Sequence, residues 1–125
     1  MKDLYLSLPS GVGKITDIES TGIESSADDF NIFRAYIKYN NGILVCYGRF
    51  SKVLNNHFVE FLAQFVNNRY MLTVSRYNNT NKANTSNSAI WVSSRLPTKF
   101  SINGDDTVDN PYGIWGDYIA IGTWK

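Results

Sequence analysis

The chain has 125 residues and a mass of 14.2 kDa, which is enough for one domain with a hydrophobic core and too little for two. Its hydrophobic content of 43% excludes a disordered chain, and its net charge of +1 lacks the basic excess of a nucleic-acid groove. No segment approaches the roughly 20 apolar residues of a transmembrane helix, and the N-terminus lacks the apolar stretch of a secretory signal, so we expect no nucleic-acid partner and no membrane insertion.

The first predicted segment, residues 1–29, is a connecting arm. It mixes Ser, Gly, Asp, Glu and Thr with isolated Leu and Ile, and it shows no long hydrophobic period. A short strand can form near residues 13–18. We expect this arm to pack on the body of the domain, which spans residues 30–125, or on a neighbouring subunit.

The second segment is a β-hairpin. From Phe33 to Tyr39 apolar residues alternate with Arg34, Tyr36 and Lys38, which is the period of a half-buried strand. The dipeptide Asn41-Gly42 is typical of a two-residue type I′ turn with positive φ at both positions. The chain then returns through residues 43–50, which are almost continuously apolar.

The remaining segments predict further short strands. Residues 57–66 fit both a helical and an alternating spacing, and their β-branched and aromatic content favours a strand that ends in a bend. Further strands are expected at residues 70–77, 89–94, 100–102 and 118–125, separated by long polar loops at 78–88 and 103–117. The predicted class is therefore all-β, a small antiparallel β-sandwich of about six to eight strands preceded by the N-terminal arm.

Four motifs resemble the C-terminal receptor-binding domains of phage tail fibres. They are the hairpin YIKYNNGILVCYG, the segments VEFLAQFVNNRYMLTVS and VSSRLPTKFSI, and the terminal YIAIGTWK. Their order and spacing are similar to that family over residues 30–125. The chain departs from the family at residues 62–64, where a proline is frequent in its members.

The resemblance carries its own implications for fold, assembly and location. It implies a sandwich similar in outline to H-type lectins, which forms a homotrimer at the distal end of a tail fibre. It also implies a virion location, synthesis in the bacterial cytoplasm, and binding to a bacterial surface carbohydrate. The partners would then be that glycan, two further copies of the chain and the remainder of the fibre.

The residues give weak support to a catalytic site or a metal site. A nucleophilic pair would need Cys46 beside His57, yet Cys46 lies in an apolar run where a small buried hydrophobe is the usual role. As the only cysteine, Cys46 also excludes an intrachain disulfide and fits synthesis in the cytosol. The acidic clusters at residues 28–29 and 105–109 lack the EF-hand spacing, and solvated loop carboxylates are the commoner case. We expect no enzyme activity, no metal and no cofactor.

The segment DNPYGIWGD, residues 109–117, is the first candidate ligand site. A sugar site needs an aromatic platform for the apolar C–H face and polar groups that hydrogen-bond the hydroxyls. This segment combines both kinds of side chain, and its candidate ligand-binding residues are Asp109, Asn110, Tyr112 and Trp115, with Asp117 beside them. The alternative is that Tyr112 or Trp115 fills the end of the sandwich or a subunit contact.

A second candidate site lies where the strand at residues 70–77 meets its loop. Arg76, Tyr77 and Asn79 supply a guanidinium, an aromatic ring and an amide there. The alternative is an ordinary strand end and its connecting loop. Of the other tryptophans, Trp91 is expected in the core or at an interface, and Trp124 in the core.

The homotrimer also has support from the residues themselves. Residues 43–50 and 58–66 are apolar on both faces, whereas a small two-layer sandwich covers only one face of each sheet. The leftover apolar surface predicts burial between subunits. Two other functions stay open beside a glycan-binding fibre tip, namely a purely structural cap that ends the fibre trimer and a free-standing lectin of the H-type kind.

Overall fold

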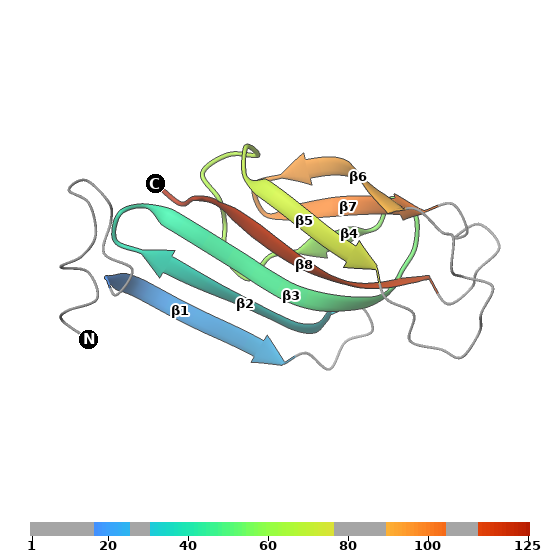
Figure 1. The fold of residues 1–125 in the computed structure, drawn as a ribbon, viewed down its shortest axis with the longest axis horizontal. Coiled ribbons are helices and arrows are strands. Elements are labelled where there is room, and N and C mark those ends of the chain that lie inside the picture. Colours follow the sequence, from blue (N-terminus) through green and yellow to red (C-terminus); the bar gives the residue numbers. More distant parts are fainter. Residues whose placement is uncertain (1–16, 26–30, 77–89, 105–112) are drawn as a thin grey trace.

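The computed structural model describes residues 17–25, 31–76, 90–104 and 113–125, and Figure 1 shows the fold. All regular secondary structure in these ranges is β-strand. The eight strands are β1 (Ile18–Ser25), β2 (Asn31–Tyr39), β3 (Ile43–Val53), β4 (Phe58–Glu60), β5 (Met71–Arg76), β6 (Ile90–Leu96), β7 (Lys99–Gly104) and β8 (Ile114–Thr123). The described ranges contain no helix long and apolar enough to span a membrane.

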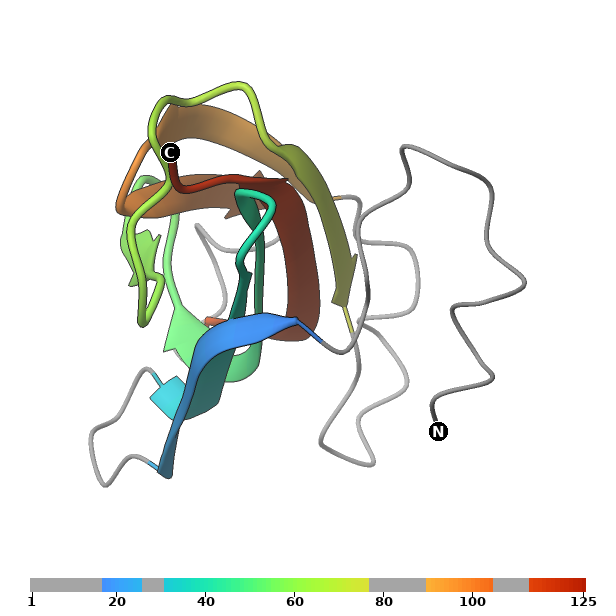
Figure 2. The ribbon, with the colours of Figure 1, turned by 90° about the vertical axis from the view of Figure 1, so that its left-hand side faces the viewer.

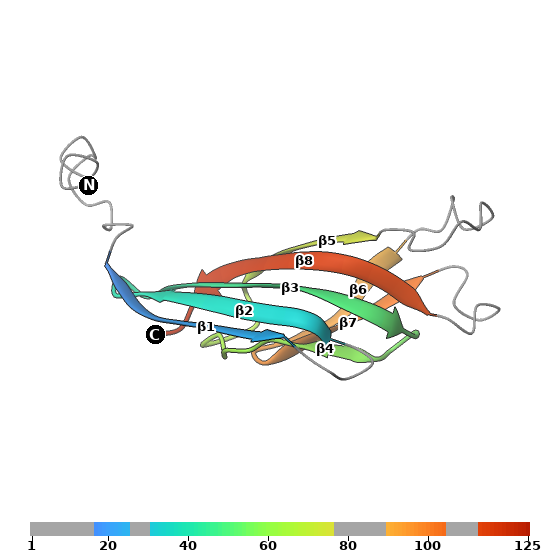
Figure 3. The same ribbon diagram turned by 90° about the horizontal axis from the view of Figure 1, so that it is seen from below.

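The strands form two antiparallel sheets. One has five strands in the order β1-β2-β3-β8-β5, and the other has three in the order β4-β7-β6. The first four strands of the larger sheet lie side by side in Figure 3, and Figure 2 shows the smaller sheet against one side of the larger. We call that side of the five-stranded sheet its inner face and the opposite side its outer face. The predicted all-β class and small antiparallel sandwich are confirmed.

The predicted β2–β3 hairpin is confirmed, but its turn differs from the expected type I′. The Gly42 N–H donates to the Tyr39 carbonyl at 3.0 Å, and Gly42 has a φ of 99°. Asn41 is not among the residues with positive φ; its Oδ1 instead accepts a hydrogen bond from the Ile43 N–H at 3.1 Å. The loop therefore has three residues, with only glycine in the left-handed region, a geometry that also matches the twist of the two strands.

Several strand boundaries differ from the expected ones. The strand β1 lies within the segment predicted as an arm and starts where the expected short strand would end, and its Ile23 pairs with Ala35 of β2. The strand β4 has only three residues before the chain bends at residues 62 and 63. The strand β8 begins at Ile114, inside the loop that was expected to reach residue 117. The larger sheet is therefore wider, and its last strand longer, than the sequence indicated.

Aromatic side chains fill the space between the two sheets. The ring of Phe61 lies at the centre, with ring centroids 5.1 Å from Phe65, 5.2 Å from Tyr70, 5.5 Å from Phe100 and 5.8 Å from Tyr118. The bend after β4 keeps its backbone satisfied, because the Phe61 and Phe65 N–H groups donate to the carbonyls of Thr98 and Pro97. Burial of these rings is the main contribution to stability on the inner face.

Candidate functional site

The structure describes only part of the two predicted ligand sites. Trp115, Asp117 and Arg76 lie in described strands. The other candidates, Asp109, Asn110, Tyr112, Tyr77 and Asn79, lie outside the described residues.

Trp115 and Asp117 belong to strand β8 and not to a loop. Ile114, Gly116 and Tyr118 alternate with them and are buried, so Trp115 and Asp117 point to the outer face. A Cβ at Gly116 would lie 2.7 Å from the Phe50 ring and 2.7 Å from the Ser75 carbonyl oxygen. Gly116, which was expected in a loop, is therefore needed for close packing within the sheet.

Arg76 is the last residue of β5 and pairs with Gly116 of β8. Its position alternates with Ser75 and shares a face with Leu72 and Val74, both of which pack against the core. Arg76 therefore points to the inner face, while Trp115, next to Gly116, points to the outer face. The structure brings these two predicted residues to the same end of the sheet, but on opposite faces.

Arg49 is a site residue that the sequence analysis missed. It pairs with Asp117 across the β3–β8 ladder, and its Nε donates to the Asp117 Oδ1 at 2.6 Å. Their side chains are 46% and 45% exposed, so both remain accessible to a ligand. Ser75 pairs with Asp117 from the other side and adds a hydroxyl to the same row.

Four residues occupy this end of the outer face, and we call them the Trp115 site: Trp115, Asp117, Arg49 and Ser75. It joins an indole ring, a carboxylate, a guanidinium and a hydroxyl at the end of the sheet where β8 begins and β5 ends. Such a group can offer an apolar platform beside charged hydrogen-bonding side chains. Among the described residues, no group of three or more His, Cys, Asp or Glu side chains could hold a metal ion.

Cys46 occupies the inner face and is fully buried. Burial raises the pKa of its thiol to about 12, although the carbonyl of Ala63 and the charge of Lys38 act in the opposite direction. A thiol with this pKa stays protonated at neutral pH and is a poor nucleophile. The predicted role of Cys46 as a small buried hydrophobe is confirmed.

The other two tryptophans lie in different settings. Trp91 was expected in the core or at an interface; it is 48% exposed on β6, which excludes the core of this chain, and the interface stays a prediction. Trp124 is partly buried against the core, as predicted, and its Nε1 donates to the Tyr39 carbonyl at 2.9 Å. The ammonium groups of Lys38 and Lys125 lie 5.3 and 5.1 Å from the centre of the Trp124 ring.

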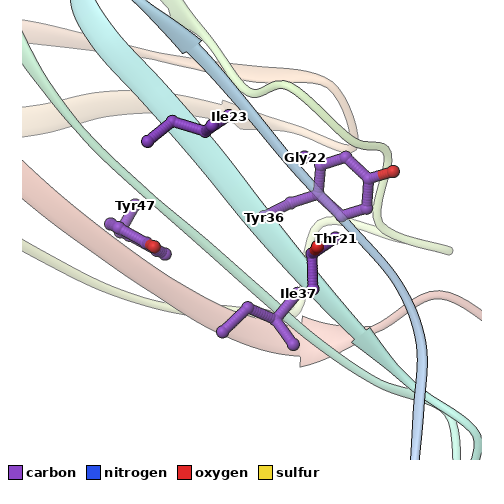
Figure 4. Close-up of a pocket in the computed structure, with 6 residues that line it drawn as sticks. All are labelled: Thr21, Gly22, Ile23, Tyr36, Ile37 and Tyr47. Carbon is purple, nitrogen blue, oxygen red and sulfur yellow. The ribbon is translucent and has the colours of Figure 1, made fainter.

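A shallow hollow lies over β1, β2 and β3 (Figure 4). It is lined by Thr21, Gly22, Ile23, Tyr36, Ile37 and Tyr47. None of these side chains is charged, and their polar groups are three hydroxyls. The Trp115 site is thus the better candidate for a polar ligand.

No protein-family model matches the sequence, and comparison with curated proteins gives no match either.

Proposed function

We propose that the chain is the tip domain of a phage tail fibre and binds a bacterial surface glycan without catalysis. The observation that carries the proposal is the Trp115 site, where the Arg49–Asp117 pair lies on the outer face and Trp115 occupies the preceding outer-face position of β8. The resemblance of the hairpin and the C-terminal motif to tail-fibre domains gives the biological setting.

The chemistry of the Trp115 site suits a sugar. A pyranose ring presents an apolar C–H face that can stack on the Trp115 indole, and its hydroxyls both donate and accept hydrogen bonds. The Asp117 carboxylate accepts such bonds and the Arg49 guanidinium donates them. Both groups are about half exposed, so a ligand can reach them, and their pairing sets their relative geometry before a ligand arrives.

The remaining candidates are close in sequence to the strand ends that form the Trp115 site. Tyr77 follows Arg76 directly, and Tyr112 directly precedes Gly113. We propose that Asp109, Asn110, Tyr112, Tyr77 and Asn79 extend the contact with the glycan beyond the Trp115 site.

The proposed assembly is a homotrimer attached to the rest of the fibre in the virion, with synthesis in the bacterial cytoplasm. The exposed apolar side chains of the five-stranded sheet support self-association. The same surface favours a second candidate function, a structural cap that holds the three chains in register while adhesion lies elsewhere. A free-standing lectin would share the Trp115 site but would have no fibre.

Glycan arrays and envelopes of susceptible bacteria test the proposal on the purified chain. Trp115→Ala should weaken binding about 5- to 30-fold, since stacking and burial of an aromatic ring contribute roughly 1–2 kcal/mol. Trp91→Ala is the matched control, because Trp91 is exposed in a strand of the other sheet. If wild type binds no envelope or glycan, the structural cap is the better account. If both variants bind like wild type, the glycan site is elsewhere.

A further inference from the structure

The outer face of the five-stranded sheet carries two uncharged rows that cross all five strands. The registers of the four strand pairs place directly opposed residues on the same face. One row is Ile23, Ala35, Tyr47, Ile119 and Thr73, and the next is Thr21, Ile37, Val45, Ile121 and Met71. We call these two rows the apolar band.

The apolar band is open in the described part of the chain. The three-stranded sheet packs on the inner face (Figure 2), and Ile23 and Met71, at the two ends of the band, are 71% and 69% exposed. Ile119 and Ile121, near the middle, are 43% and 38% exposed. Isolated exposed apolar residues are ordinary, but a continuous patch across a whole sheet marks an interaction surface.

The charges on this face point to a partner that is itself uncharged there. The apolar band contains no Lys, Arg, Asp or Glu. In the adjoining row, Ser25, Phe33, Arg49, Asp117 and Ser75, the two charged side chains pair with each other at 2.6 Å. The face therefore has no net charge to attract a charged partner, and it is complementary to another copy of itself.

The size of the face also fits an interface between copies. Five strands about 4.8 Å apart span about 24 Å, and three rows about 6.8 Å apart, namely the apolar band and the row with Ile43 and Thr123, span about 20 Å. Without the row of Arg49 and Asp117, the face thus offers about 480 Å² per copy, or about 1,440 Å² summed over the three copies of the proposed trimer, which is comparable in size to a specific interface.

The apolar band contains a depression into which a partner's side chain can pack. Ala35 lies between Ile23 and Tyr47 in its row and is only 1% exposed, because its neighbours are larger. The hollow in Figure 4 is lined by Thr21, Ile23, Ile37 and Tyr47 of this face together with Gly22 and Tyr36, whose strand positions alternate with theirs. A protruding isoleucine or methionine of a second copy can fill it, as sheets packed face to face interdigitate.

We propose that copies of this chain associate through the apolar band, each turning its outer face toward the others. This inference rests on the self-association proposed above and adds which surface the copies share. It leaves the Trp115 site at the margin of the interface, one end of the sheet being free for a ligand.

Light scattering of purified variants tests the assignment. Wild type should show about three times the 14.2 kDa of one chain at micromolar concentration, and Ile119→Lys should show the mass of one chain. Trp91→Lys is the matched control, since Trp91 is 48% exposed on the other sheet, and its mass should stay that of wild type. Circular dichroism should show a β spectrum for each variant.

A second readout needs no substitution. Met71 should react with dilute peroxide at least tenfold more slowly in native wild type than in unfolded protein, although it is 69% exposed in a single copy. Mass spectrometry of the peptide that contains Met71 measures the rate. In Ile119→Lys the protection should be lost.

The outcomes separate the two proposals. A wild type of 14.2 kDa with unprotected Met71 overturns both self-association and the shared face. An oligomer whose mass and Met71 protection are unchanged by Ile119→Lys overturns the face alone. A single-chain mass with protected Met71 that becomes reactive on deletion of residues 1–16 would show that the chain's own N-terminal segment covers the band, and this also overturns the proposal.

Discussion

The two faces of the five-stranded sheet are built from the same strands but differ in how far their side chains are buried. Along β3, Leu44 and Cys46 point inward and are fully buried, whereas Val45 and Tyr47 point outward and are only partly buried. Both sets are apolar. The inner face is covered by the chain's own aromatic core, while the outer face meets no described element and carries the Trp115 site at one end. Hydrophobic side chains therefore stabilise the fold on one side and remain available for partners on the other.

The largest difference between the faces should appear on truncating their side chains. Phe61→Ala removes the ring at the centre of the aromatic core and should lower the free energy of unfolding by about 3–5 kcal/mol. Thr73→Ala changes an exposed side chain in the outer row and should cost less than about 1 kcal/mol. Urea unfolding of both variants measures this. Similar losses in the two variants would contradict a stabilising role confined to the inner face.

The next largest effect is expected at alkaline pH, which should lower the free energy of unfolding through buried groups of the inner face. Burial raises the pKa of Cys46 from 9.0 to about 12 and that of Tyr70 from 10.0 to about 12 in the folded chain. Below pH 9 both groups are protonated in both states, so stability is unaffected. Above it the unfolded chain releases protons that the folded chain keeps, and stability falls as the pH rises toward 12.

Between pH 9 and 10 the thiol is the main contributor, with a slope that approaches about 1.4 kcal/mol per pH unit. Cys46→Ala should flatten the pH dependence in this interval. Urea midpoints of wild type and variant at pH 8, 9 and 10 measure the change. Parallel curves would show that Cys46 does not keep its proton in the folded state.

A smaller and more selective effect is expected at the Trp115 site. Arg49→Lys keeps the charge but loses the planar fork, so glycan binding should weaken several-fold while stability changes by less than about 1 kcal/mol, since the ion pair is half exposed. Arg69→Lys is the control, because Arg69 is exposed near the opposite end of β5. Equal binding by both variants would remove Arg49 from the site.

The sequence predicted the elements whose alternation is strong. The hairpin of β2 and β3 and the strand β5 combine apolar period with clear turn residues, so their existence follows from local pattern. The strand β1 could not be read this way, because Ile18–Ser25 mixes Glu, Ser, Thr and Gly with two isoleucines and lies at the edge of the sheet. Its structure depends on pairing with β2 rather than on its own composition.

The site was predicted only in part because it depends on register between distant strands. Arg49 and Asp117 are 68 residues apart in sequence, and only the β3–β8 pairing places them together. Trp115 was found as an aromatic residue near polar ones, but its glycine neighbours suggested a loop. Gly116 instead makes room for Phe50, a contact that no local pattern reveals.

The most direct test follows the three indole N–H signals of the chain by nuclear magnetic resonance while an envelope glycan is added. The account predicts that the Trp115 signal shifts with increasing glycan, while those of Trp91 and Trp124 stay in place. A shift confined to Trp91 or Trp124, or no shift with a glycan that the chain is shown to bind, would contradict it.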